Sequence, residues 1–191
     1  MEKEHKTKKV TMAKKPASKK FEYENNPMRE IKIEKVVLSV GATGDALAKG
    51  VKLLEVLTKR TPKKTTSNKR IPTLGVRPGL EMGAVVTIRK DVAPLLNKLL
   101  VAVDNTIRRR QIAHNHFSFG IKEYLEIPGV EYQRDVGIMG LDVTVVFKRS
   151  GRRVALRKIK KGTFPKIQGV FREEIIKFME EKFNTNFIGK L

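Results

Sequence analysis

Residues 141–148 read LDVTVVFK, and this stretch decides the fold class. Leu141, Val143, Val145 and Phe147 alternate with a second set of positions that includes aspartate, threonine and lysine. A period of two predicts a β-strand with one buried face. Such a strand belongs to a sheet that is covered on one side and open to solvent on the other.

Further segments on both sides of this stretch complete the prediction. Strand-like patterns cover 31–40, 84–89, 117–124 and, beyond a turn signal at Ser150-Gly151, roughly 152–158. Apolar residues at helical spacing predict a helix N-capped by Asp45 that stops before Pro62, one from Asp91 to the arginines at 108–110, and one over 170–183. The sequence therefore predicts an α+β fold with a sheet of about five strands.

Each predicted helix has one apolar face that we expect to lie against the core. These faces are Leu47, Val51, Leu54 and Leu57; Leu96, Leu99, Leu100, Val103 and Ile107; and Phe171, Ile175, Phe178 and Met179.

Positive charge dominates the composition, with 41 Lys and Arg against 20 Asp and Glu and a formal net charge of +21. Residues 1–20 hold eight lysines and two glutamates without any hydrophobic period, so we expect a basic, flexible tail. Subtracting that net +6 leaves +15 on residues 21–191, which we expect to form a single domain ending in a hairpin and a helix. A folded body with this charge predicts a polyanionic partner, and an open sheet face is a suitable platform for nucleic acid.

Several classes of protein are disfavoured by what the chain contains. It has no cysteine, which excludes disulfides and thiolate chemistry, and no apolar run near the ~18 residues of a membrane span, so we expect a cytoplasmic protein without a membrane partner. Gly41-Ala42-Thr43-Gly44 lacks the ending of a phosphate-binding loop and favours a tight turn. His114 and His116 have no nearby third ligand or general base. We therefore predict a protein without metal, cofactor or catalytic site.

Two basic segments are the candidate RNA contacts. Residues 59–70 (KRTPKKTTSNKR) contain six basic residues, no acid and interleaved hydroxyl and amide groups, which suits phosphate, 2′-hydroxyl and base contacts. A solvated basic loop is the alternative. Residues 148–161 (KRSGRRVALRKIKK) contain eight basic residues and no acid; here Arg149, Arg152 and Arg153 are the expected contacts, and a charged edge strand that deters aggregation is the alternative.

An ordered set of short motifs then indicates a family. The motifs are Asn26-Pro27-Met28-Arg29-Glu30-Ile31, Leu38-Ser39-Val40-Gly41, Thr65-Thr66-Ser67-Asn68-Lys69, Gly75-Val76-Arg77-Pro78-Gly79, Val86-Thr87-Ile88-Arg89, Asn115-His116-Phe117-Ser118-Phe119-Gly120 and Gly140-Leu141-Asp142-Val143-Thr144. Over about residues 25–150 the chain resembles the 5S-rRNA-binding L-five family of large-subunit ribosomal proteins, in its archaeal and eukaryotic form. The remainder is similar to the C-terminal extension of the archaeal type.

The resemblance implies an antiparallel sheet with helices on one face, and a place in the central protuberance of the large ribosomal subunit. The implied partners are 5S rRNA, large-subunit rRNA, other proteins of the central protuberance, P-site tRNA and a small-subunit head protein across an intersubunit bridge. The implied rRNA contacts are Ser39, Gly41, Lys63, Lys64, Thr65, Thr66, Asn68, Lys69, Arg70, Thr87 and Arg89. The implied tRNA-facing loop is Gly75, Val76, Arg77, Pro78, Gly79, Leu80, Glu81 and Met82, and the bridge is expected near 108–114 and 134–138.

The sequence departs from the family pattern at three places. Ser39 replaces a usual Asn, Leu74 replaces a usual Phe, and Glu81-Met82-Gly83 replaces Pro-Ile-Gly, which puts an acid in the tRNA-facing loop. Two other classes remain as alternatives. A DNA-binding protein would show a recognition helix with exposed basic and amide residues, and an RNA-modifying enzyme would show a catalytic constellation or a cofactor loop.

Overall fold

The computed structural model describes residues 26–189, except the side chain of Leu74. The predicted tail at 1–20 and the expected start of order near Phe21 lie outside these residues. The strands are β1 (Lys32–Gly41), β2 (Lys63–Thr66), β3 (Glu81–Ile88), β4 (Thr106–Arg108), β5 (Ile112–Ala113), β6 (His116–Ile121), β7 (Leu141–Lys148) and β8 (Asn186–Ile188). The α-helices are α2 (Asp45–Thr58), α3 (Val92–Val101), α4 (Arg153–Leu156) and α5 (Arg172–Phe183). Short 3-10 turns are η1 (Pro27–Arg29), η2 (Pro72–Leu74), η3 (Arg109–Gln111), η4 (Tyr124–Glu126) and η5 (Lys166–Gln168).

Six of the strands form one antiparallel sheet in the order β2-β3-β1-β7-β6-β5. The long strand β1 lies at its centre and pairs with β3 on one side and with β7 on the other. The predicted α+β class with an antiparallel sheet is confirmed. The sheet gains β2 and β5, which are too short to leave a periodic pattern in the sequence, and β4 and β8 form a separate parallel pair.

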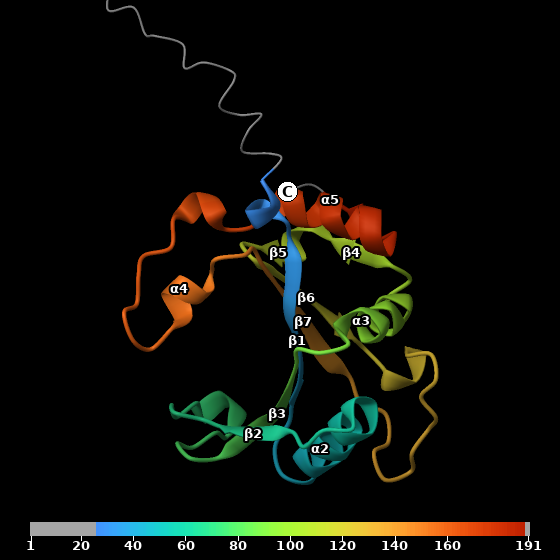
Figure 1. The fold of residues 1–191 in the computed structure, drawn as a ribbon. Coiled ribbons are helices and arrows are strands. Elements are labelled where there is room, and N and C mark those ends of the chain that lie inside the picture. Colours follow the sequence, from blue (N-terminus) through green and yellow to red (C-terminus); the bar gives the residue numbers. More distant parts are fainter. Residues whose placement is uncertain (1–25, 190–191) are drawn as a thin grey trace, which may run out of the picture.

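The core lies between one face of the sheet and the helices α2 and α3 (Figure 1). The alternation in β7 places Leu141, Val143, Val145 and Phe147 in this core, with exposed fractions of 0–3%. Helix α2 packs on β1 and β3, and α3 packs on β1. Both helices cover the same side, so the sequence prediction of a sheet covered on one face is confirmed.

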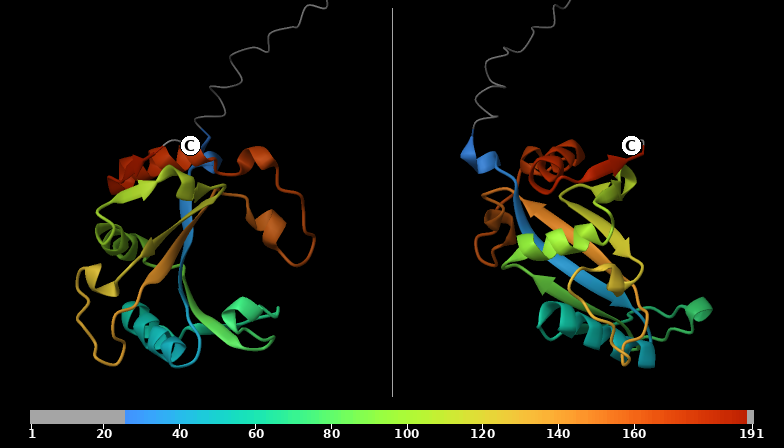
Figure 2. Two further views of the ribbon diagram at one scale, coloured as in Figure 1. Left: turned by 180° about the vertical axis from the view of Figure 1, so that it is seen from behind. Right: turned by 90° about the vertical axis from the view of Figure 1, so that its right-hand side faces the viewer.

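The C-terminal helix α5 closes one end of the sheet, beside β5 (Figure 2). Ile175 and Met179 are fully buried, and the ring of Phe178 meets the ring of Phe147 edge-on at 5.7 Å between centroids. Phe171 does not share this buried face as predicted. It is the residue just before the helix and is 42% exposed.

The second predicted helix is shorter than the sequence indicated. It ends at Val101 instead of continuing to the arginines at 108–110, because Asp104 and Asn105 adopt positive φ angles of 51° and 52°. Ile107 is buried as expected, but within strand β4 and not on a helix face. The three arginines therefore do not lie at a helix C-terminus.

The predicted strand at 152–158 is wrong, and with it the C-terminal hairpin. Residues 153–156 form the single helical turn α4, which follows Gly151 at φ +88°. The topology explains the failure: β7 already pairs with β1 along one edge and with β6 along the other, so no edge is left for a returning strand. The first helix shows a smaller difference, because Gly44 and not Asp45 is the residue before it; Gly44 has φ +61° in the predicted tight turn.

Candidate RNA-binding surface

The uncovered face of the sheet, opposite α2 and α3, carries mostly short polar side chains. Its strand register places Lys63, Val85, Ser39, Asp142 and Gly120 side by side across β2, β3, β1, β7 and β6. Short side chains leave room for a polymer backbone to come close to the strands. We call this side of the sheet the open face.

The next row of the open face contains Thr87, Val37, Thr144 and Ser118 across β3, β1, β7 and β6. All four are half-buried or exposed. Three hydroxyl groups in one row supply donors and acceptors for phosphate oxygens and 2′-hydroxyls.

Five of the predicted rRNA contacts meet on the open face. Ser39, Thr87 and Lys63 belong to the two rows above, and Thr65 pairs with Gly83, which in turn pairs with Gly41. The backbones are close here: a Cβ on Gly83 would lie 2.9 Å from the carbonyl oxygen of Val40. A glycine at position 83 therefore lets β3 lie close to its neighbouring strands.

The neighbouring predicted contact, Lys64, points to the other side of β2. Its Nζ lies 2.9 Å from Oε2 of Glu81, in an ion pair whose side chains are about half exposed. Glu81 and Met82 were predicted to belong to the tRNA-facing loop, but they form the start of β3. The acid that departs from the family pattern is thus placed on a strand, where it faces a lysine.

Residues 67–80 form a loop whose two sides are held together by backbone hydrogen bonds. Ser67 N–H donates to the carbonyl of Leu80 at 2.9 Å, and Gly79 N–H donates to the carbonyl of Ser67 at 2.8 Å. Further out, Ile71 and Val76 exchange two bonds of 3.0 Å, and the buried Val76 anchors the loop. The remaining residues predicted in this loop are exposed, namely Asn68, Lys69, Arg70, Gly75, Arg77, Pro78, Gly79 and Leu80.

In the second basic segment, residues 148–161, the first arginine is engaged inside the molecule and does not lie on the surface as predicted. The Arg149 side chain is 3% exposed; its guanidinium lies 2.6 Å from Oε1 of Glu174 and donates to the carbonyl of Ile167 at 3.4 Å. Burial removes Arg149 from the surface, so the prediction of a direct RNA contact is wrong for this residue. It instead joins the end of β7 to α5 and to the segment before it.

Arg152 is also engaged inside the molecule. Its guanidinium lies 3.3 Å from Oε2 of Glu34 and donates to the carbonyl of Phe147, while Arg153 next to it is exposed. The four basic residues that follow are exposed as well, namely Arg157, Lys158, Lys160 and Lys161. In Figure 1, this segment and the loop at 67–80 lie on the side of the sheet away from α2 and α3.

The sequence did not indicate that several further residues lie on the open face. Lys35 and His116 both pair with Val146 of β7, and Lys32 pairs with Lys148 where β1 and β7 end. The alternation of β1 and β6 was the signal that could have found them. The β-bulge near Glu34 hides that signal for Lys32, because it shifts the alternation by one residue.

The histidine pair has a packing role in the structure. The His114 ring meets Phe171 edge-on at 5.3 Å between centroids, and the Nδ1 of His116 lies 3.0 Å from the carbonyl oxygen of His114. Among residues 26–189, no three His, Cys, Asp or Glu side chains are grouped in a way that could hold a metal ion. Within the same residues, no helix is long and apolar enough to cross a membrane.

Residues 81–180 match the model of the C-terminus of the ribosomal L5 protein family. The chain belongs to this family. The large ribosomal subunit protein uL5 of Picrophilus torridus is 39% identical over 174 residues, which cover 88% of this chain and 99% of that protein. The proteins of the same name from Methanobrevibacter smithii and Nanoarchaeum equitans are 35% and 40% identical, each over 85% of this chain and 98% and 99% of theirs.

Membership of this ribosomal family confirms three predictions: the suspected family, a ribosomal and cytoplasmic location, and a protein that is not an enzyme. It also decides between the alternatives, since neither a DNA-binding protein nor an RNA-modifying enzyme fits a ribosomal protein that matches its relatives over nearly their full length.

Proposed function

We propose that this structural protein of the large ribosomal subunit binds 5S rRNA through its open face and helps to attach that RNA in the central protuberance. The observation that carries the proposal is the shared orientation of the cationic groups. The open face lies between the loop at 67–80 and the basic residues at 153–161, and both of these lie on the side of the sheet away from α2 and α3 (Figure 1).

The mechanism is phosphate neutralisation combined with recognition of RNA shape. Lys63 on the edge strand and Lys69 and Arg70 in the loop supply exposed cations at one edge of the sheet, while Thr87, Ser39 and Thr144 offer hydroxyl groups on the adjoining strands β3, β1 and β7. Thr66, Asn68 and Arg89 border this area. The short side chains of the open face let an RNA backbone approach the sheet closely.

The decisive experiment is a titration of the full-length protein with 5S rRNA. We expect the triple variant Lys63→Ala, Lys69→Ala, Arg70→Ala to bind about 100-fold more weakly or worse, because each lost contact contributes about 1 kcal/mol. The slope of log affinity against log salt should also decrease by about 2 to 3. Filter binding at several salt concentrations measures both quantities.

The matched control removes three lysines from the other parts of the surface, namely Lys49→Ala, Lys98→Ala and Lys177→Ala on α2, α3 and α5. It has the same change in net charge and should retain most of the affinity. Equal losses for the two triple variants would contradict binding through the open face. Equal affinity of the wild type for tRNA and for 5S rRNA would contradict the proposed RNA partner.

Two further contacts belong to the same proposal. The exposed end of the loop at 72–80, including Arg77, approaches the P-site tRNA, and the surfaces at 108–114 and 134–138 face a protein of the small-subunit head. Ile138 supports the second contact, since it is a large apolar side chain with an exposed fraction of 69%. On assembled ribosomes, chemical probing of the P-site tRNA and crosslinking from position 138 test these contacts.

A further inference from the structure

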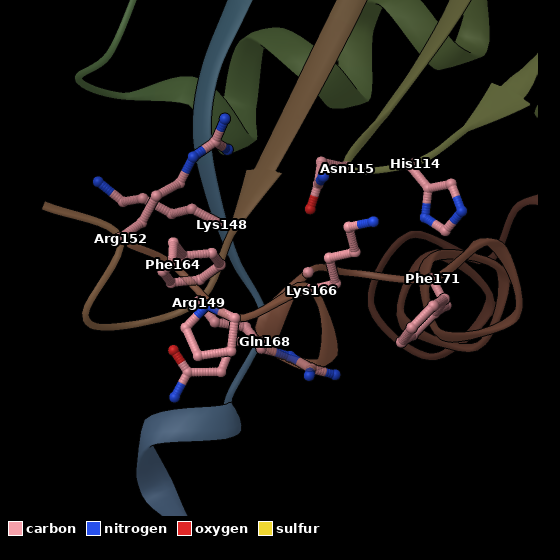
Figure 3. A pocket seen from close by; sticks show the side chains of 11 residues that line it. His114, Asn115, Lys148, Arg149, Arg152, Phe164, Lys166, Gln168 and Phe171 are labelled. Carbon is pink, nitrogen blue, oxygen red and sulfur yellow. The ribbon is translucent and has the colours of Figure 1, made fainter. Parts of the chain in front are cut away.

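A pocket of about 440 Å³ lies at the far end of the open face, where β7 runs into the C-terminal part of the chain (Figure 3). It opens to solvent and has the size of a small-molecule site. Three segments far apart in the sequence form its walls, at 114–115, 148–152 and 164–171.

The walls of this pocket are held in place by hydrogen bonds to Asn115, which has φ +63°. Its backbone N–H donates to the carbonyl of Val170 at 3.1 Å, and its Oδ1 accepts from the N–H of Val170 at 2.8 Å. Its own carbonyl accepts from Phe147 N–H at 2.8 Å. The segment at 164–171 is thereby joined to the end of the sheet, and the pocket is built between them.

The charge of the pocket is strongly positive. Lys148, Arg149, Arg152 and Lys166 line it, and no acidic residue of the described part, 26–189, does. Glu174 and Glu34 pair with the two arginines, whereas no ion pair with Lys148 or Lys166 is formed within residues 26–189. The pocket thus offers cationic groups to an anion.

Aromatic rings also line the pocket and can stack on a planar ligand. Figure 3 shows Lys148, Arg152 and Phe164 on one side of it and His114, Lys166 and Phe171 on the other. The carboxamide of Gln168 also lines it, and amides of this kind bond to the edges of bases. A phosphate together with a planar ring is the chemistry of a nucleotide, and RNA-binding proteins stack unpaired bases on aromatic side chains.

We propose that the pocket binds one unstacked nucleotide of a bound RNA, with a phosphate at Lys166 and the base against Phe164. The proposal rests on the proposed RNA-binding function, and it adds a site for a single-stranded or bulged nucleotide to the contacts of the open face. The volume of about 440 Å³ is large enough for one nucleotide.

The test uses the full chain and a trinucleotide RNA with 2-aminopurine between two uridines. Stacking quenches 2-aminopurine fluorescence, so we expect saturable quenching by the wild type. Phe164→Leu should weaken binding about 5-fold or more, in line with base–aromatic stacking measured by substitution, and Lys166→Gln should weaken it several-fold. The matched controls Ile159→Ala, at an exposed apolar residue, and Lys98→Gln, on α3, should leave binding unchanged.

A map of amide chemical shifts in the wild type gives an answer that does not depend on the variants. Addition of the trinucleotide should shift signals of residues 114–115, 148–149 and 164–171. Shifts elsewhere only, or no quenching, would overturn the pocket proposal even if 5S rRNA binds, whereas a wild type that fails to bind 5S rRNA would overturn the proposed function. If inorganic phosphate competes fully and Phe164→Leu has no effect, the pocket takes an anion and the nucleotide proposal is wrong.

Discussion

The two basic segments of this ribosomal protein have nearly the same composition and different structures. Residues 59–70 contain six basic residues and residues 148–161 contain eight, and neither contains an acid. In the first segment the cations stay at the surface, and Lys64 alone forms an ion pair within the described residues. In the second, Arg149 is buried and Arg152 is half-buried, and both are paired with glutamates.

The difference comes from acids that lie elsewhere in the chain. Arg149 pairs with Glu174 in α5, and Arg152 pairs with Glu34, which is 118 residues away in sequence. These pairs tie the C-terminal part of the molecule to the ends of β1 and β7. A run of basic residues therefore identifies a charged segment, while the fold decides which of its cations remain available to RNA.

Arg149→Ala is the substitution with the largest expected effect. It distinguishes a cation that stabilises the fold from one that binds RNA. The change leaves Oε1 of Glu174 with only the guanidinium of Arg29, at 4.0 Å, takes the Arg149 donor from the carbonyl of Ile167 and opens a gap beneath α5. Glu174 is 30% exposed, which reduces the cost below that of a fully buried pair, so we expect a loss of about 2 to 3 kcal/mol in the free energy of unfolding. Urea denaturation measures it.

The control for this variant is Arg153→Ala, at an exposed residue of the same segment, which should change stability by less than about 0.5 kcal/mol. The affinity of folded Arg149→Ala protein for 5S rRNA should remain within about 2-fold of the wild type. A stable variant with much weaker RNA binding would contradict the structural role and restore Arg149 as an RNA contact.

The sequence predicted the central part of the fold well because periodicity is a local property. The predicted strand at 141–148 matches β7 at both ends, and the helix expected after Asp45 ends at Thr58, before Pro62. One of the two main errors involves information from outside the segment, and the other is a turn within it. The strand at 152–158 fails because both edges of β7 are occupied, and the second helix stops early at the turn of Asp104 and Asn105.

The site was predictable to the same degree. Ser39, Thr87 and Lys63 lie on one face because the alternation of their strands fixes it, and the structure brings them together. Lys64 was grouped with them through the family resemblance, and Arg149 was added because of the charge of its segment. Neither Glu81 nor Glu174 is adjacent in sequence to the cation that it pairs with, so no local pattern indicates that these two positive charges are engaged.

A smaller effect is expected within the first segment, where Lys63 and Lys64 occupy opposite sides of β2. Lys63→Ala should weaken 5S rRNA binding by about 5- to 10-fold and lower the salt slope by about 0.7 to 0.9, because an open-face cation is lost. Lys64→Ala should weaken it by less than about 2-fold. Both residues are exposed, so the melting temperatures of the two variants should agree with that of the wild type. Equal affinities of the two variants would show that RNA binding does not depend on which side of β2 the lysine occupies.

The smallest effect is expected at Glu81, the partner of Lys64. Glu81→Gln breaks an ion pair whose side chains are 51% and 47% exposed, so the free energy of unfolding should change by less than about 0.5 kcal/mol. The same change releases Lys64 and removes a negative charge beside the basic loop, which should raise the affinity for 5S rRNA by about 2-fold at low salt. Glu180→Gln, at an exposed residue of α5, makes an identical change in net charge at the opposite end of the molecule from β2 (Figure 1). If filter binding gives the same gain in affinity for both variants, the change in net charge alone explains it. A gain confined to Glu81→Gln means that the acid next to the basic segment 59–70 weakens the attraction of that segment to the RNA.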